Sequence, residues 1–139
     1  MVLVDSSVWI EAARRKGALE VKVALEALLE EYEAALCPPV LLEVLGGARK
    51  QDRRRLKAYL SVLPSLNLTP DSWQHAVELS WKLRDLGRTI PWNDLLIGTV
   101  ALQHDCRVYA VDAHFDIMGE EAGLRLYRSG YGGKYQPEA

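Results

Sequence analysis

Short apolar runs alternate with longer helical patterns along most of the chain, and this alternation restricts the possible folds more than any other feature. Strands are predicted over Val2–Val4, Ala34–Cys37, Leu66–Leu68 and Arg107–Val111, with a further candidate over Leu124–Tyr127. Such short strands separated by helices favour a parallel sheet that is covered by helices on both faces. The sequence therefore predicts the α/β class, as a three-layer α/β/α sandwich with a central parallel sheet of four to five strands.

The intervening helices are predicted from apolar periodicity and from residues that start or stop a helix. Ser6 or Ser7 can cap the helix that follows the first strand. Further helices are predicted over residues 18–32, 40–45, 49–62, 70–86 and 91–102. Because the last of these is apolar almost all round, we expect it to be buried on several sides. The tail after Ser129, which is rich in Gly and Tyr, is predicted to be irregular.

Length and composition agree with one globular unit. The chain has 139 residues, of which 49% are hydrophobic and 26% charged, so we expect a single domain over residues 1–139. No uncharged apolar run reaches the roughly 18 residues of a membrane-spanning helix, and the N-terminus lacks the basic start of a signal peptide. Cys37 and Cys106 lie in apolar surroundings without metal-type spacing. This predicts reduced core residues and a cytoplasmic location.

The net charge of −2 argues against a broadly basic surface for nucleic acid. Contacts with phosphates would need a local patch or a bound metal. One basic run contains Arg49, Arg53 and Lys57, and Arg14–Lys16 forms a second, shorter one. A solvated helix face is the more ordinary interpretation of such a run, and a patch for the RNA backbone is the alternative.

Four acidic residues from distant parts of the chain are expected at one edge of the predicted sheet. In a parallel sheet the carboxyl ends of all strands share an edge, and ligands bind there. Asp5 ends the first strand and Asp112 ends the fourth. Glu43 lies in the first turns of the helix after the second strand, and Asp94 begins the helix that runs back to the fourth. Topology thus predicts that all four lie in one cleft.

Clustered carboxylates repel one another, and their pKa values rise unless something neutralises them. A hard cation such as Mg²⁺ or Mn²⁺ does so through oxygen ligands. A cation held in this way can activate water and stabilise the charge of a phosphoryl transition state. One metal and two metals are both compatible with the four acids.

Taken singly, each acid also has a purely structural explanation. Asp5 could cap a helix, Glu43 could be an exposed helix residue, and Asp94 could favour the helix dipole. Asp112 could be a cap or a turn residue. Their joint placement favours function, and a carboxylate beside the apolar segment 95–97 would be costly without a partner.

Four segments resemble, in order, the four motifs of the PIN-domain ribonucleases. They are Val4–Ile10, Leu42–Gly46, Ile90–Thr99 and Val111–Phe115. Each motif is weak alone, but the set covers nearly the whole chain and is specific. The departures are mild: Gly98 stands where the family often has Ala, and Val111 where Thr or Ser followed by a basic residue is frequent. Neither removes an acid.

The resemblance implies an α/β/α fold and Mg²⁺- or Mn²⁺-dependent hydrolysis of RNA phosphodiesters. It assigns metal binding to Asp5, Glu43, Asp94 and Asp112, and it makes Ser7 the polar residue that supports Asp5. Asp116 is a second acid near the fourth motif, which could act through a water and leaves the assignment of Asp112 open. The chain is similar in size to the VapC-like toxins, which commonly form homodimers and are silenced by a small antitoxin.

Several aromatic and histidine residues carry weaker signals. Trp73 and Trp81 are spaced for one helix face, which is more typical of a core or an interface than of base stacking. His114 could be a general base, although a surface or capping role is the more ordinary interpretation.

Two other functions remain as alternatives to a nuclease. A metal-dependent phosphatase would need a second acid directly after the first strand, where Asp5-Ser6-Ser7 supplies only one. A non-catalytic binding module could keep the acids without activity. Neither G-x-G-x-x-G nor G-x-x-x-x-G-K-[ST] occurs, so nucleotide-cofactor and ATPase functions lack support.

Overall fold

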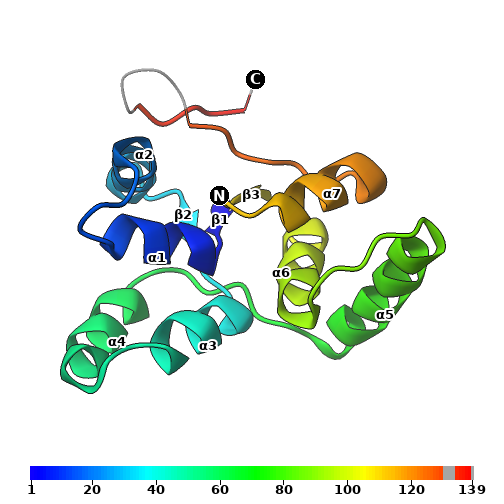
Figure 1. Cartoon of the computed structure of the whole chain (residues 1–139), viewed down its shortest axis with the longest axis horizontal. Coiled ribbons are helices and arrows are strands. Elements are labelled where there is room, and N and C mark those ends of the chain that lie inside the picture. The colour runs from blue at the N-terminus through cyan, green and yellow to red at the C-terminus, as the bar shows by residue number, and fades with distance from the viewer. Residues whose placement is uncertain (130–133, 139) are drawn as a thin grey trace.

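Strands and helices alternate in the computed structural model, which describes residues 1–129 and 134–138 (Figure 1). In chain order the elements are β1 (Val2–Val4), α1 (Ser6–Ala13), α2 (Leu19–Glu30), β2 (Ala34–Ala35), α3 (Pro38–Gly46), the 3₁₀ turn η1 (Lys50–Asp52), α4 (Arg53–Ser61), α5 (Pro70–Asp85), α6 (Trp92–Gln103), β3 (Arg107–Tyr109) and α7 (Ala113–Ala122). This order is the predicted α/β alternation.

The described residues form a parallel sheet in the order β2-β1-β3. Val2 pairs with Ala34 on one side of β1 and with Arg107 on the other. The chain therefore leaves β1 toward one edge and later returns to the opposite edge. Because crossovers between parallel strands are right-handed, α1 and α2 cover one face and α6 the other, giving three layers (Figure 1). The strand order reverses at β1, where sheets of this kind bind ligands.

The sheet has three strands within residues 1–129 and 134–138, not the four to five predicted. The two missing strands lie at the expected edges but form only isolated bridges, Leu36 with Ser65 and Val108 with Leu126. Each bridge has two hydrogen bonds, such as those that join Leu36 to Pro64 and Leu66. The segments run alongside the sheet for one residue pair only, which is too short for a ladder.

The core lies between the sheet and its helices. Val2, Leu3 and Val4 are fully buried. In α6, Ile97 and Val100 are also fully buried, and the prediction that this helix is enclosed on several sides is confirmed. Burial of one such side chain stabilises the fold by roughly 1.5–3 kcal/mol.

Cys37 and Cys106 are buried free thiols, as predicted for core residues. Burial raises the pKa of Cys37 to about 12, so its thiol stays protonated at neutral pH. In the described residues, no helix is both long enough and apolar enough to cross a membrane.

Several helix boundaries differ from the predictions, and for α7 (Ala113–Ala122) no range was predicted. Helix α3 begins at Pro38, two residues before the predicted start, because proline fits the first turn of a helix. The predicted helix over 49–62 is divided into η1 and α4 at Asp52, whose carboxylate pairs with Arg49 and Arg55. Of the tail predicted to be irregular, residues 134–138 contain no helix or strand, while 130–133 and 139 lie outside the described residues.

Candidate metal centre

Asp5 follows β1 directly and forms the N-cap of α1. Its Oδ2 accepts hydrogen bonds from the Ser7 backbone N–H at 3.0 Å and from Ser7 Oγ at 2.5 Å. The prediction that Ser6 or Ser7 caps this helix is therefore wrong by one or two positions. A carboxylate at the cap satisfies the exposed N–H groups of the first turn and is favoured by the helix dipole.

The second carboxylate oxygen of Asp5 has no such partner. Asp5 is only 2% exposed, and its Oδ1 receives no hydrogen bond from any residue in the described part of the chain. Desolvation raises the pKa of Asp5 to about 6; the hydrogen bonds from Ser7 oppose this rise, and the charges of Asp94 and Glu43 add to it. A divalent cation would supply the missing partner for this oxygen.

Ser7 also joins the two strand ends that carry acids. Its Oγ accepts a hydrogen bond from the Val111 backbone N–H at 3.1 Å, directly before Asp112. The side chain that orients Asp5 thus also fixes the loop between β3 and α7. This position agrees with a supporting role for Ser7.

Glu43 reaches the same edge from α3, although its side chain is exposed. Its Oε1 accepts hydrogen bonds from Ser6 Oγ at 2.9 Å and from Asn93 Nδ2. Neither Ser6 nor Asn93 was assigned to the metal site from the sequence. Both stand beside a predicted acid in a motif segment, which was the available signal.

Asp94 lies in the first turn of α6 and is only 8% exposed. Burial raises the pKa of Asp94 above its ordinary value. The negative charges of Asp112 and Glu43 contribute to this rise, whereas the hydrogen bond from His114 opposes it. The carboxylate therefore lies in surroundings that favour a cation.

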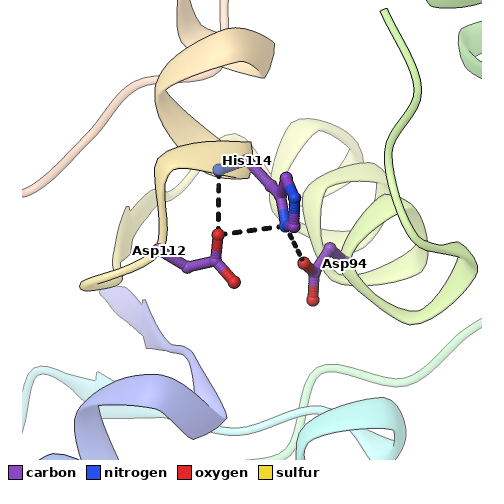
Figure 2. Close-up of side chains that lie close together, drawn as sticks. All are labelled: Asp94, Asp112 and His114. Atoms are coloured by element: carbon purple, nitrogen blue, oxygen red, sulfur yellow. Dashed lines mark hydrogen bonds and ion pairs between the residues drawn. The ribbon is translucent and has the colours of Figure 1, made fainter.

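Asp112 forms the N-cap of α7, and its Oδ1 accepts the His114 backbone N–H at 2.9 Å. Figure 2 shows the His114 ring between the carboxylates of Asp112 and Asp94. Its Nδ1 lies 3.0 Å from Asp112 Oδ1 and 2.8 Å from Asp94 Oδ2. The side chain of His114 thus belongs to the acidic cluster. The capping role favoured from the sequence applies only to its backbone N–H, which Asp112 accepts.

The four acids form two groups that share Asp94. In one group, ligand atoms of Asp5, Glu43 and Asp94 all lie within 4.8 Å of one another, and the other joins Asp94 to Asp112 and His114 within the same limit. The carboxylate oxygens in both sets suit Mg²⁺ and Mn²⁺, and the second set adds the nitrogen of His114. A bound cation would give the buried Oδ1 of Asp5 the partner that no described residue supplies.

Asp116 and the basic residues are placed elsewhere. Asp116 pairs with Arg128 at 2.8 Å and belongs to neither group found among the described residues. Arg49 lies directly before η1 and pairs with Asp52, while Arg53 begins α4 and donates to the Ala48 carbonyl oxygen. Lys57 lies on α4 with an exposed side chain.

An aromatic groove lies on α5 and α6, away from the sheet. Trp73, Val77 and Trp81 follow one another along α5 with 57%, 43% and 62% of their surfaces exposed, and Trp92 beside them on α6 is 66% exposed. They line a groove of about 460 Å³. Trp73 and Trp81 are therefore not core residues, and an interface or, less typically, base stacking remains as their predicted role.

Comparison with known proteins shows where this architecture recurs. The sequence-family model of the PIN domain matches residues 2–121 of this chain. A ribonuclease of Mycobacterium tuberculosis, VapC11, is 32% identical over 130 residues, which are 90% of this chain and 96% of the relative.

Solved structures share the fold at lower identity. A promoter-DNA-bound VapBC2 complex from Rickettsia felis contains a chain with a TM-score of 0.74 and 22% identity, covering 91% of this chain and 98% of that one. The FitAcB structure from Neisseria gonorrhoeae matches with a TM-score of 0.73 and 18% identity, covering 93% and 98%.

Proposed function

The chain belongs to the PIN-domain family, and from this premise we propose that it is a metal-dependent endoribonuclease that hydrolyses RNA phosphodiester bonds. The observation that carries the proposal is Asp5, which is buried beside Glu43 and Asp94 with one carboxylate oxygen that lacks a partner among the described residues. The ribonuclease name of the VapC relatives supports the same reaction class.

Asp5, Glu43, Asp94 and Asp112 would hold Mg²⁺ or Mn²⁺. When bound, the cation would activate water and stabilise the charge that develops on the phosphoryl group. The chain itself supplies orientation: Ser7 fixes Asp5, while Ser6 and Asn93 fix Glu43. Held side chains preserve the geometry that hydrolysis needs.

The partners follow from the same family. RNA is the proposed substrate, and Arg49, Arg53 and Lys57 are proposed contacts for its backbone. A small antitoxin is the proposed protein partner, since the related folds include a VapBC complex and toxin–antitoxin pairs. With two buried thiols, the chain also suits the cytoplasm, which is the proposed location.

The aromatic groove on α5 and α6 supports a homodimer. Trp73 and Trp81 lie four residues on either side of Val77. Antiparallel pairing of two α5 helices around Val77 would place Trp73 of one copy opposite Trp81 of the other.

The function is tested by incubating the purified chain with structured RNA in Mg²⁺ or Mn²⁺. We expect cleavage that a chelator abolishes and that Asp5→Asn or Asp94→Asn lowers by more than about 100-fold, since even outer-shell changes at metal sites cost 10–100-fold. Asp85→Asn is a matched control, because this exposed acid lies at the end of α5. Equal activity in all variants would point to a contaminating nuclease or to a wrong site.

The same assay separates the alternatives. If the RNA stays uncleaved while a phosphomonoester is hydrolysed, the result would favour a phosphatase. No turnover of either substrate, with no binding of millimolar Mn²⁺ by calorimetry, would favour a non-catalytic module. Comparison of Asp112→Asn with Asp116→Asn decides between these two acids: the pairing of Asp116 with Arg128 predicts the larger loss for Asp112.

A further inference from the structure

His114 places a nitrogen atom among the carboxylates of the candidate metal centre. Its Nδ1 lies 2.8 Å from an oxygen of Asp94 and 3.0 Å from an oxygen of Asp112 (Figure 2). Asp94 lies in α6 and Asp112 is the N-cap of α7, so the imidazole joins two separate elements. The ring has two nitrogens that can bind a metal, unlike any other residue in the cluster.

These separations are those of neighbouring ligands on one cation. Two ligands at right angles, each about 2.1 Å from an octahedral ion, lie about 3.0 Å apart. The Nδ1 atom therefore already stands where a ligand next to both carboxylates would stand. Small rotations of the three side chains would exchange their mutual hydrogen bonds for bonds to an ion.

The grouping of the acids leaves room for a second ion. Asp5, Glu43 and Asp94 form one set, and the Oδ1 of Asp5, in a side chain that is 2% exposed, has no hydrogen-bond partner among the described residues and could bind a cation there. Asp112 belongs only to the other set, with Asp94 and His114. Asp94 would therefore serve both positions.

We propose that His114 is a nitrogen ligand of a second cation position, formed with Asp112 and the shared Asp94, and that this position prefers Mn²⁺ to Mg²⁺. The inference rests on the proposed metal-dependent function. Imidazole suits transition metals, whereas Mg²⁺ selects oxygen ligands. The first position has carboxylates alone and accepts either ion.

Electron spin-echo spectroscopy of bound Mn²⁺ tests the ligand directly, because a coordinated imidazole gives a ¹⁴N modulation. We expect this signal in the unchanged protein at two Mn²⁺ per chain and its loss in His114→Gln. The substitution keeps the backbone N–H that Asp112 caps, so α7 should form as before. His104→Gln is the matched control, because this exposed histidine contacts Asn67 instead and should leave the signal intact.

Calorimetry gives a second measurement. In His114→Gln, the affinity for the second Mn²⁺ should fall at least about tenfold, whereas that for the first should remain. The inference would be overturned if the protein bound one Mn²⁺ without ¹⁴N modulation and His114→Gln left the affinity for that ion unchanged. The proposed function would still stand in that case. If the unchanged protein binds no Mn²⁺, both fail.

Discussion

At the residue scale, the acids at the strand ends combine two roles that looked like alternatives. Asp5 uses Oδ2 to cap α1 and keeps Oδ1 free of hydrogen-bond donors in the described structure. Asp112 likewise caps α7 through Oδ1. A cap holds a carboxylate in one orientation, because it anchors one oxygen to the backbone. The helix start therefore helps to build the candidate cation site.

Asp5→Asn should stabilise the protein when no metal is bound. The pKa of about 6 lies above the ordinary value of 3.8, so the folded state binds this proton more tightly than the unfolded chain. Stability without metal thus falls as the pH rises from about 4 to about 6 and stays low above it. Asparagine keeps the cap but carries no charge, and the free energy of unfolding should increase by on the order of 2 kcal/mol at pH 7.5.

Urea unfolding in the presence of a chelator measures this change. The control is the same measurement at pH 4, where Asp5 is protonated and the two proteins should differ little. A variant that is less stable than the parent at pH 7.5 would show that the buried charge is compensated.

The affinity for Mn²⁺ should depend on pH for the same reason. Below about pH 6 the ion must displace the proton of Asp5, so the apparent affinity should fall about tenfold per pH unit there. The raised pKa of Asp94 steepens the fall. Calorimetry between pH 5 and pH 8 measures it, and equal affinities at pH 5 and pH 7 would contradict the prediction.

At the element scale, close packing of α6 on α7 fixes the distance between Asp94 and Asp112. The contact includes Gly98 of α6 and Met118 of α7, which is fully buried. A Cβ atom at Gly98 would lie 2.5 Å from Met118 Sδ and 3.0 Å from its Cε. Only glycine permits this approach without movement of the methionine.

Gly98→Ala should therefore destabilise the protein despite the better helix propensity of alanine. The propensity gain is about 1 kcal/mol, and overpacking of a buried contact costs about 1–3 kcal/mol. The net loss should be about 1 kcal/mol, measured by urea unfolding. A double-mutant cycle with Met118→Ala checks the cause: the cost of Gly98→Ala should vanish in that background. An equal cost in both backgrounds would exclude this contact.

At the scale of the whole molecule, the outer face of α5 exposes the side chains of Trp73, Val77 and Trp81. Figure 1 shows α5 at the periphery, with α6 between it and the sheet. Large aromatic surfaces grouped on one exposed face mark interaction sites in soluble proteins. Pairing of two chains there would bury the tryptophans. The four acids do not line this groove, so each copy would keep its own metal centre.

Trp81→Glu should convert a dimer into a monomer. Loss of a central interface tryptophan, replaced by a charge, should raise the dissociation constant of the dimer at least about thirtyfold. Light scattering over a range of concentrations measures it. Leu19→Glu is the matched control, because Leu19 is 73% exposed at the start of α2 and lies outside the groove. A monomeric parent protein would refute the proposed pairing.

The sequence by itself determined the class of fold and the edge at which the acids gather. Apolar periodicity sets which segments become strands or helices, and parallel strands necessarily share a carboxyl edge. The placement of Asp5 and Asp112 follows from that rule alone. The count of strands did not follow, because a single bridge at Ser65 or Leu126 carries the same local apolar pattern as a ladder.

Only the tertiary structure decided how the side chains meet. The hydrogen bonds of Ser6 and Asn93 to Glu43, and the position of His114 between two acids, join residues from separate elements. Likewise Asp116, one helical turn after Asp112, pairs with Arg128 instead of the cluster. Such contacts depend on how helices pack and rotate against one another, and local sequence patterns do not encode distances between elements.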